Sequence, residues 1–140
     1  MRKIMTLAFA LLFAFSLVAI SNSTATEKAE QAVAAVDWNA FSKNLKQALQ
    51  SENDGLRQSA MRHIIRYGDK VNVGDGMLEI LRTYRSDDDL QARRLALAAL
   101  PKTGSRLAIG FLRNAVKFEK SEVLKRQIQF ILAEDAATRN

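Results

Sequence analysis

The sequence predicts an all-α domain built from stacked helix–turn–helix units, and three observations carry this prediction. The segment 56–64 recurs as 92–100, with Arg57 matched to Arg93, at an offset of 36 residues. A period of this size is typical of repeats that bury their apolar faces against one another. Apolar residues also recur at helical spacing along most of the chain. The chain has a single proline and no extended alternation of β-branched residues, which argues against strands.

The N-terminus has the order of a secretory signal peptide. Arg2 and Lys3 precede the run 4–20, which carries no charge, and small polar residues follow at once. We expect cleavage after Ala25, and a cut after Ser21 is the alternative. The mature protein would then be periplasmic or secreted. An uncleaved N-terminal membrane anchor is the alternative, because the run spans 17 residues, the lower limit for crossing a bilayer.

Composition excludes several classes of protein. The chain has no cysteine, so it has neither a disulfide framework nor the cysteine that a lipoprotein needs at its cleavage site. One histidine without cysteine also excludes a structural zinc site. Charge is uneven: residues 26–89 carry a formal charge of −2 and residues 90–140 a charge of +6. The C-terminal half is therefore the electropositive part of the chain.

The first helices are expected from apolar spacing and N-cap residues. A short helix is expected over 27–36. Asp37 is expected to cap a helix whose stripe is formed by Trp38, Phe41, Leu45 and Leu49. Asn53 or Asp54 is expected to cap the next helix, over 56–67. Gly68 should end it, because glycine tolerates a left-handed backbone.

The later helices follow the same rules. Asp75 is expected to cap a helix over 77–84. The run Asp87–Asp89 is interpreted as the cap of a helix over 89–100 rather than as a cation site. Pro101 and Gly104 stop that helix, another starts at Ser105, and a last helix spans 122–134. The segment 77–82 matches 108–113 at an offset of 31, so the loop within the second unit is shorter.

The arrangement resembles the HEAT-repeat superfamily over about residues 54–134. The segment 92–100 carries the pattern apolar–Arg–x–x–Ala and a following glycine, 56–64 matches it in part, and 124–132 in outline. The resemblance implies a short right-handed α-solenoid. The expected organisation is a signal peptide (1–25) and one domain (26–140) with N-terminal capping helices (26–53), repeat 1 (54–88), repeat 2 (89–120) and a half-repeat C-terminal cap (121–140).

No motif for catalysis, metal binding or cofactor binding stands out. His63 is the only histidine and is expected to pack between helices, because no nucleophile motif accompanies it. Val71 and Val73 occupy positions where an EF-hand needs oxygen ligands. No glycine loop is followed by the Lys-Ser/Thr of a phosphate site. We therefore expect no catalytic, cofactor or metal residue.

The recurring arginines, Arg57 and Arg93, are expected to be structural and to bond to carbonyls or an acid between helices. The basic C-terminal half is interpreted as a solvated face. Contact with an anionic membrane surface or an acidic protein is the alternative. Nucleic acid is not expected as a partner, because the chain is predicted to be exported.

The leading functional hypothesis is an exported scaffold or adaptor that binds another envelope protein and performs no chemistry. The alternative is a regulatory module that senses the envelope state or restrains a transmembrane regulator. An enzyme with an unfamiliar site is a third hypothesis. Aromatic and arginine side chains are favoured at interfaces. On this basis the candidate partner-binding residues are Trp38, Phe41, Tyr84, Arg113 and Lys117, with Trp38 and Phe41 alternatively buried as an N-terminal cap.

Overall fold

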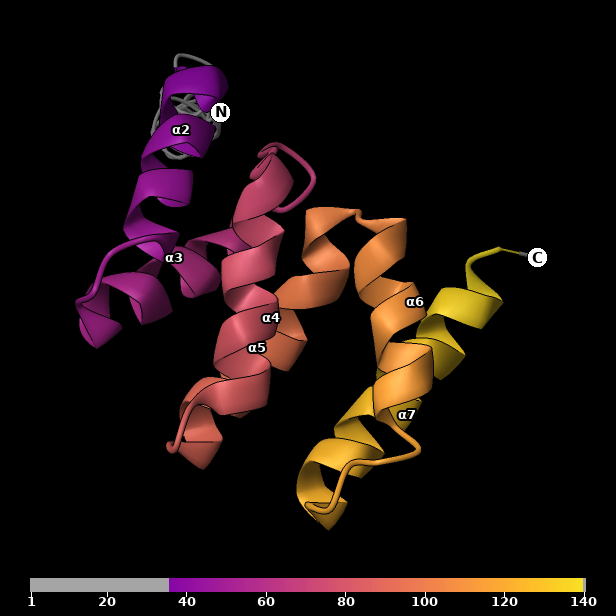
Figure 1. The fold of residues 1–140 in the computed structure, drawn as a ribbon. Coiled ribbons are helices and arrows are strands. Elements are labelled where there is room, and N and C mark those ends of the chain that lie inside the picture. Colours follow the sequence, from indigo (N-terminus) through magenta and orange to yellow (C-terminus); the bar gives the residue numbers. More distant parts are fainter. Residues whose placement is uncertain (1–35, 140) are drawn as a thin grey trace, which may run out of the picture. The chain divides into compact units, whose positions relative to one another are not determined.

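The computed structural model describes residues 36–139, which contain helices and no strand, so the prediction of an all-α fold is confirmed for this part of the chain (Figure 1). The helix expected over 27–36 lies outside the described residues except for Val36, and the expected signal peptide lies outside them entirely. In chain order the helices are α2 (Trp38–Leu49), α3 (Asp54–Tyr67), η1 (Gly74–Gly76), α4 (Met77–Ser86), α5 (Leu90–Ala99), η2 (Leu100–Thr103), α6 (Arg106–Ala115) and α7 (Glu122–Ala137), where η marks a 3-10 helix.

Side-chain caps begin five of the six α-helices. Asp37 accepts hydrogen bonds from the main-chain N–H groups of the first turn of α2, and Asn53 caps α3 in the same manner. Asp89, Ser105 and Ser121 cap α5, α6 and α7. Each cap satisfies donors that the first turn of a helix leaves free and contributes about 1 kcal/mol. These caps explain why the chain enters each helix where it does.

Two local predictions are wrong. Gly68 has a right-handed backbone, with φ of −57°. Glycine stands there because an added Cβ would lie 2.6 Å from the carbonyl oxygen of Lys102. Asp75 does not cap α4, which follows directly from η1 without a side-chain cap. The carboxylate of Asp75 instead lies 2.5 Å from Lys46 Nζ, and the hydrogen bond from that ammonium group lowers the pKa of Asp75.

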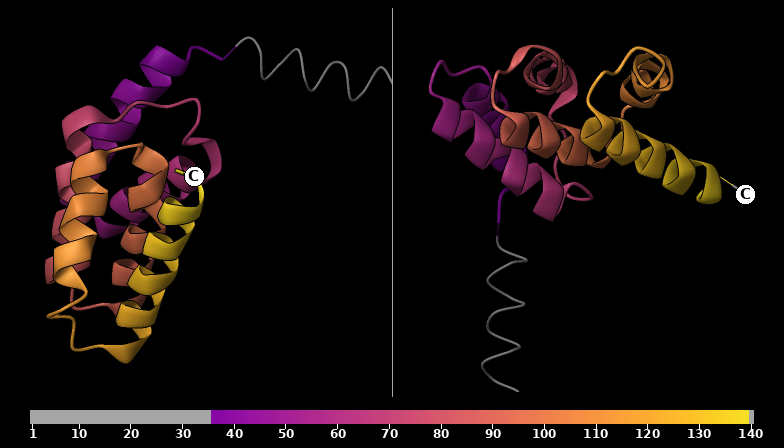
Figure 2. Two further views of the ribbon diagram at one scale, coloured as in Figure 1. Left: turned by 90° about the vertical axis from the view of Figure 1, so that its right-hand side faces the viewer. Right: turned by 90° about the horizontal axis from the view of Figure 1, so that it is seen from below.

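The helices pack as three consecutive hairpins: α2 with α3, α4 with α5, and α6 with α7. The second helices of the hairpins also pack on one another in order, α3 on α5 and α5 on α7. Figure 2 shows α4 and α6 together on one side of the row formed by α3, α5 and α7. The predicted unit boundaries at 54, 89 and 121 fall within these hairpins and stay a prediction.

One apolar core runs through the three hairpins. Its members stand on the facing sides of the helices, at the three- and four-residue spacing seen in the sequence. Burying each Leu, Ile or Met side chain stabilises the fold by about 1.5–3 kcal/mol. The largest fully buried side chains are Leu49, Met61, Ile64, Ile80, Leu97, Leu100, Leu112, Leu124 and Ile128.

Candidate functional site: two grooves between helical hairpins

The loops inside the three hairpins share one hydrogen-bond pattern. In each loop, the residue two positions before the N-cap accepts a hydrogen bond from the main-chain N–H of the N-cap. The N-caps stand 36 and then 32 residues apart in the sequence, so the three loops hold equivalent places. The donor–acceptor distances are 3.1 Å for Asn53 to Ser51, 2.9 Å for Asp89 to Asp87 and 2.9 Å for Ser121 to Glu119.

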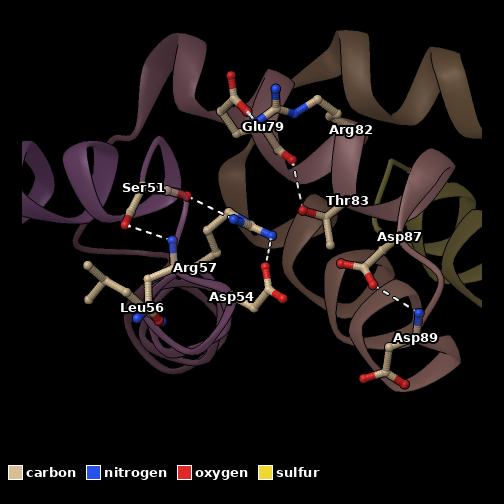
Figure 3. Close-up of polar contacts among 10 residues, drawn as sticks. Ser51, Asp54, Leu56, Arg57, Glu79, Arg82, Thr83, Asp87 and Asp89 are labelled. Atoms are coloured by element: carbon tan, nitrogen blue, oxygen red, sulfur yellow. Dashed lines mark hydrogen bonds and ion pairs between the residues drawn. The ribbon is translucent and has the colours of Figure 1, made fainter.

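Four positions after each N-cap stands a basic side chain, which is Arg57, Arg93 or Lys125. The two arginines are the pair that the 36-residue recurrence singles out. Arg57 Nη1 donates to the main-chain oxygen of Ser51 at 2.9 Å, and its Nη2 pairs with Asp54 (Figure 3). Arg57 therefore holds the loop after α2 against the first turn of α3.

A first groove lies beside Arg57, between the loop after α2 and the C-terminal half of α4, with a volume of about 420 Å³. Both arginines on its walls are engaged: Arg57 pairs with Asp54, and Arg82 lies 2.7 Å from Glu79 (Figure 3). Its lining is polar and includes two carboxylates. The residues that define the first groove are Ser51, Glu52, Arg57, Arg82, Thr83 and Asp87.

A second groove lies between α4, α6 and the loop before α7, and its volume is about 740 Å³. It stands next to Arg93 as the first groove stands next to Arg57. Aromatic rings replace the hydroxyl and amide groups on much of its lining. The residues that define the second groove are Tyr84, Arg85, Arg93, Phe111, Phe118 and Lys120, together with the shorter side chains between them.

The Glu119 carboxylate joins three elements beneath the second groove. Tyr84 Oη, on α4, donates to Glu119 Oε2 at 2.7 Å, and Arg93 Nη2, on α5, donates to the same oxygen at 3.3 Å. Arg93 Nε also donates to the main-chain oxygen of Tyr84 at 2.7 Å. The Glu119 side chain is only 7% exposed. Charge-assisted hydrogen bonds in such a place are strong, so this network fixes the loop that precedes α7.

The same network shifts two pKa values. Burial raises the pKa of Tyr84, and the hydrogen bond to Glu119 and its negative charge raise it further, against the opposing charge of Arg93. Burial also acts to raise the pKa of Glu119. The hydrogen bonds from Ser121 N–H and Tyr84 and the charge of Arg93 outweigh burial, so this pKa lies below its ordinary value of 4.5. At neutral pH Tyr84 is therefore a phenol and Glu119 a carboxylate.

Phe118 stands at the rim of the second groove with 81% of its surface exposed. Its main-chain N–H donates to the oxygen of Ala115 at 3.0 Å, and the next residue, Glu119, is held by the network beneath. Inside the groove, the ring of Phe111 meets Tyr84 edge to face, with ring centres 6.2 Å apart. An exposed aromatic ring on a loop that is already ordered has the character of an interface anchor.

Two predicted partner-binding residues, Trp38 and Phe41, lie far along the chain from this groove, in an aromatic cluster at the first hairpin. The ring of Trp38 lies 5.8 Å from Phe41 and 5.6 Å from Tyr67, centre to centre. His63 stacks on Tyr67 and meets Phe41 edge-on, as expected of a packing histidine. Trp38 and Phe41 are half-buried, which corresponds to the alternative of an N-terminal cap.

The other three predicted partner-binding residues lie on or near α4 and α6. Tyr84 is 3% exposed, so it forms the floor of the second groove and offers almost no free surface. Arg113 is exposed, and its Nη2 lies 3.1 Å from Asp135 on α7. Lys117 is exposed just after α6, beside Phe118. The structure thus brings Tyr84 and Lys117 close to one site and engages Arg113 elsewhere.

Sequence reasoning missed Phe118, the most exposed residue of the second groove, although a signal was present. The second helices of the recurrence are offset by 31 residues, which matches Ser86 to Lys117, whereas the following N-caps are offset by 32. Asp87 therefore corresponds to Glu119. Phe118 is the one additional residue in the second loop, and the first loop has no counterpart for it.

Residues 36–139 contain no group of three or more His, Asp or Glu side chains that could hold a metal ion. In the same range, every helix is too short or too polar to cross a membrane.

Comparisons with known proteins leave the second groove without a precedent. No family model matches the sequence, and no curated protein or solved structure is similar enough to match it. The functional argument therefore rests on the geometry of the grooves.

Proposed function

We propose that this chain is an exported, non-enzymatic adaptor that binds another envelope protein through the second groove. The observation that carries the proposal is the position of Phe118, which is 81% exposed on an ordered loop beside a groove of about 740 Å³. Exposing a phenylalanine ring to water is unfavourable, and aromatic residues dominate the contacts that hold interfaces together. A partner that covers Phe118 would recover this energy.

We further propose that the scaffold is a short right-handed α-solenoid of HEAT-like repeats. Three features support this architecture: the succession of hairpins, the packing of α3 on α5 and α5 on α7, and the recurring N-cap geometry with a basic residue four positions later. In stacked repeats, each unit contacts mainly its neighbours, so the gaps between units recur as equivalent grooves. The two grooves would be such a pair.

Export is the third part of the proposal and rests on the N-terminal sequence pattern. The order of basic residues, an uncharged apolar run and small residues is that of a secretory signal. N-terminal sequencing of the protein recovered from the cell envelope tests it. A mature chain that begins at Thr26 or Asn22 supports cleavage, and a chain that retains residues 1–20 in the membrane supports the anchor instead.

Site-specific photocrosslinking tests the binding function. A photoreactive phenylalanine analogue is placed at position 118 of the full chain in its native host, and the adducts are identified by mass spectrometry. The matched control places the same analogue at position 130, because Phe130 is also exposed, at 63%, and lies on α7 away from the groove. We expect one discrete protein adduct from position 118 and none from position 130.

The crosslink must also depend on the groove. Replacing Arg85, which lines the groove beside Phe111, by glutamate should remove the adduct at position 118. Equal labelling from positions 118 and 130, or labelling of many proteins in proportion to their abundance, would show that Phe118 has no specific partner.

A further inference from the structure

The rim of the second groove carries positive charge without nearby compensation. Arg85, Lys117 and Lys120 are all exposed, and none of them forms an ion pair with another residue in the described range 36–139. Glu119 is the one carboxylate on the lining of the groove, and Arg93 and Tyr84 already engage it. The groove therefore has a positive potential that attracts carboxylates.

The first groove has the opposite balance. Its two arginines, Arg57 and Arg82, are each paired with a carboxylate. Its lining also includes Glu52 and Asp87, and Asp87 accepts only the N–H of the adjoining N-cap. Two grooves at equivalent places thus differ in sign, so the positive charge of the second groove is not a property of the scaffold.

Apolar surface lies within the positive rim. Phe118 projects at one edge, and the ring of Phe111 lies inside, with Arg85 Cζ 5.9 Å from its centre. A guanidinium group over an aromatic ring keeps its outward N–H groups available for a carboxylate. One segment could therefore place an apolar side chain on the rings and its carboxylates on the cations.

Concavity distinguishes such a segment from a flat membrane surface. The apolar and charged groups line a depression, and its floor is the buried ring of Tyr84. A lipid surface could contact Phe118 and the lysines, but it could not reach Phe111 between α4 and α6. An extended peptide chain could reach both.

We propose that the second groove recognises an acidic segment of the partner protein that carries a large apolar side chain. The apolar side chain packs against Phe118 and Phe111, and the flanking carboxylates face Arg85 and Lys120. This inference rests on the proposed binding function and names the chemistry of the partner. The network of Tyr84, Arg93 and Glu119 holds the groove open in advance, which lowers the entropic cost of binding.

Fluorescence polarisation with the full mature chain tests the inference. The probe is a short labelled peptide of aspartate and glutamate with one central phenylalanine. The comparison probes are the same peptide with alanine at the centre, a peptide with lysine in place of every acid, and vesicles of phosphatidylcholine and phosphatidylglycerol in equal parts. We expect micromolar binding of the first probe, which weakens as salt rises, and binding at least about tenfold weaker for the other two peptides.

Variants locate the binding in the groove. Phe118→Ala and Arg85→Glu should each weaken the acidic probe by about tenfold, whereas Phe130→Ala and Lys43→Glu, which change exposed residues on α7 and α2, should leave it within about twofold. Circular dichroism melting shows whether each variant folds. Lys120→Glu, in the loop, replaces Arg85→Glu if that variant does not, because Arg85 also stabilises the C-terminal end of α4.

Three results would overturn the inference. The first is equal binding of the acidic and lysine peptides, and the second is binding of vesicles without binding of any peptide. The third is unchanged affinity in Phe118→Ala and in the folded charge-reversal variant. A specific crosslink at position 118 together with any of these results would leave the adaptor function standing and reject only the acidic specificity. Loss of the crosslink as well would reject both.

Discussion

The two grooves occupy equivalent places in consecutive hairpins, beside Arg57 and Arg93, and yet they differ in chemistry. In the first groove, the arginine pairs with Asp54 on its own helix. In the second groove, the arginine reaches Glu119 in the loop before α7, and Tyr84 reaches the same oxygen. The difference teaches that a repeated arginine can serve either local capping or the assembly of a site, depending on which acid lies within reach.

Removing each arginine should break this comparison most strongly. We expect Arg93→Ala to lower the free energy of unfolding by about 3 kcal/mol, because it leaves the Glu119 carboxylate, 7% exposed, without its cation. Arg57→Ala should cost about 1 kcal/mol, because Asp54 is exposed to water. Urea unfolding at neutral pH measures both. Equal losses would mean that the two grooves are held in the same way.

The acid of the second groove should give the next largest effect, and it should depend on pH. We expect Glu119→Gln to cost about 2 kcal/mol at neutral pH, because the hydrogen bonds of Tyr84 and Arg93 to a charged group become hydrogen bonds to an amide. The folded pKa of Glu119 lies below its ordinary value of 4.5. The stabilisation from the charge is therefore complete above that value and disappears as pH falls through the folded pKa.

Urea unfolding of the wild type and Glu119→Gln across the acid range measures this dependence. The difference in stability should shrink as pH falls below 4.5. The matched control is Asp87→Asn in the first groove, which should change stability by less than about 0.5 kcal/mol at neutral pH, since the amide oxygen still accepts from Asp89 N–H. A difference for Glu119→Gln that stays constant with pH would contradict the assigned role of the charge.

Deleting Phe118 should convert the second loop to the spacing of the first. We expect the variant to fold with a loss of about 1 kcal/mol or less, a fall in Tm of roughly 4–8 °C at most, because a surface loop absorbs the change. Thermal unfolding followed by circular dichroism measures this. Deleting Asp88, for which the first loop has no residue to spare, is the control and should cost more. A ΔPhe118 chain that does not fold would show that the additional residue is structural.

The smallest effect on stability is expected where the largest effect on binding is proposed. Phe118→Ala should change the free energy of unfolding by less than about 0.5 kcal/mol, because its ring is 81% exposed. Phe130→Ala should behave in the same way. A loss above about 1 kcal/mol for Phe118→Ala, seen in urea unfolding, would place the ring in the packing of the fold rather than at a free surface.

The helices were predictable because each carries its own signals. Asp37, Asn53 and Asp89 stand where caps are needed, and apolar residues follow at helical spacing. The predictions for Gly68 and Asp75 failed for a shared reason. Both residues answer to a partner far along the chain, Lys102 and Lys46 respectively, and local patterns carry no information about such partners.

The site was harder to predict than the fold. Tyr84 was proposed as a surface contact, because its type favours interfaces, and only the packing of α4 against α5 and α6 reveals its burial. Glu119 was not singled out, because its partner Arg93 lies 26 residues earlier in the chain. Phe118 was detectable in principle from the mismatch between the two offsets of the recurrence.

Gly68 has a consequence for mutational scanning. An added Cβ there would lie 2.6 Å from the Lys102 carbonyl oxygen and 2.9 Å from that of Ile64. Both obstacles are main-chain atoms, so no side-chain rotation relieves the contact. A deep mutational scan would thus score Gly68 as intolerant of every substitution, with the same profile as a ligand-binding position. At this turn, intolerance reports how closely two backbones approach, and abundance assays rather than binding assays would reveal the difference.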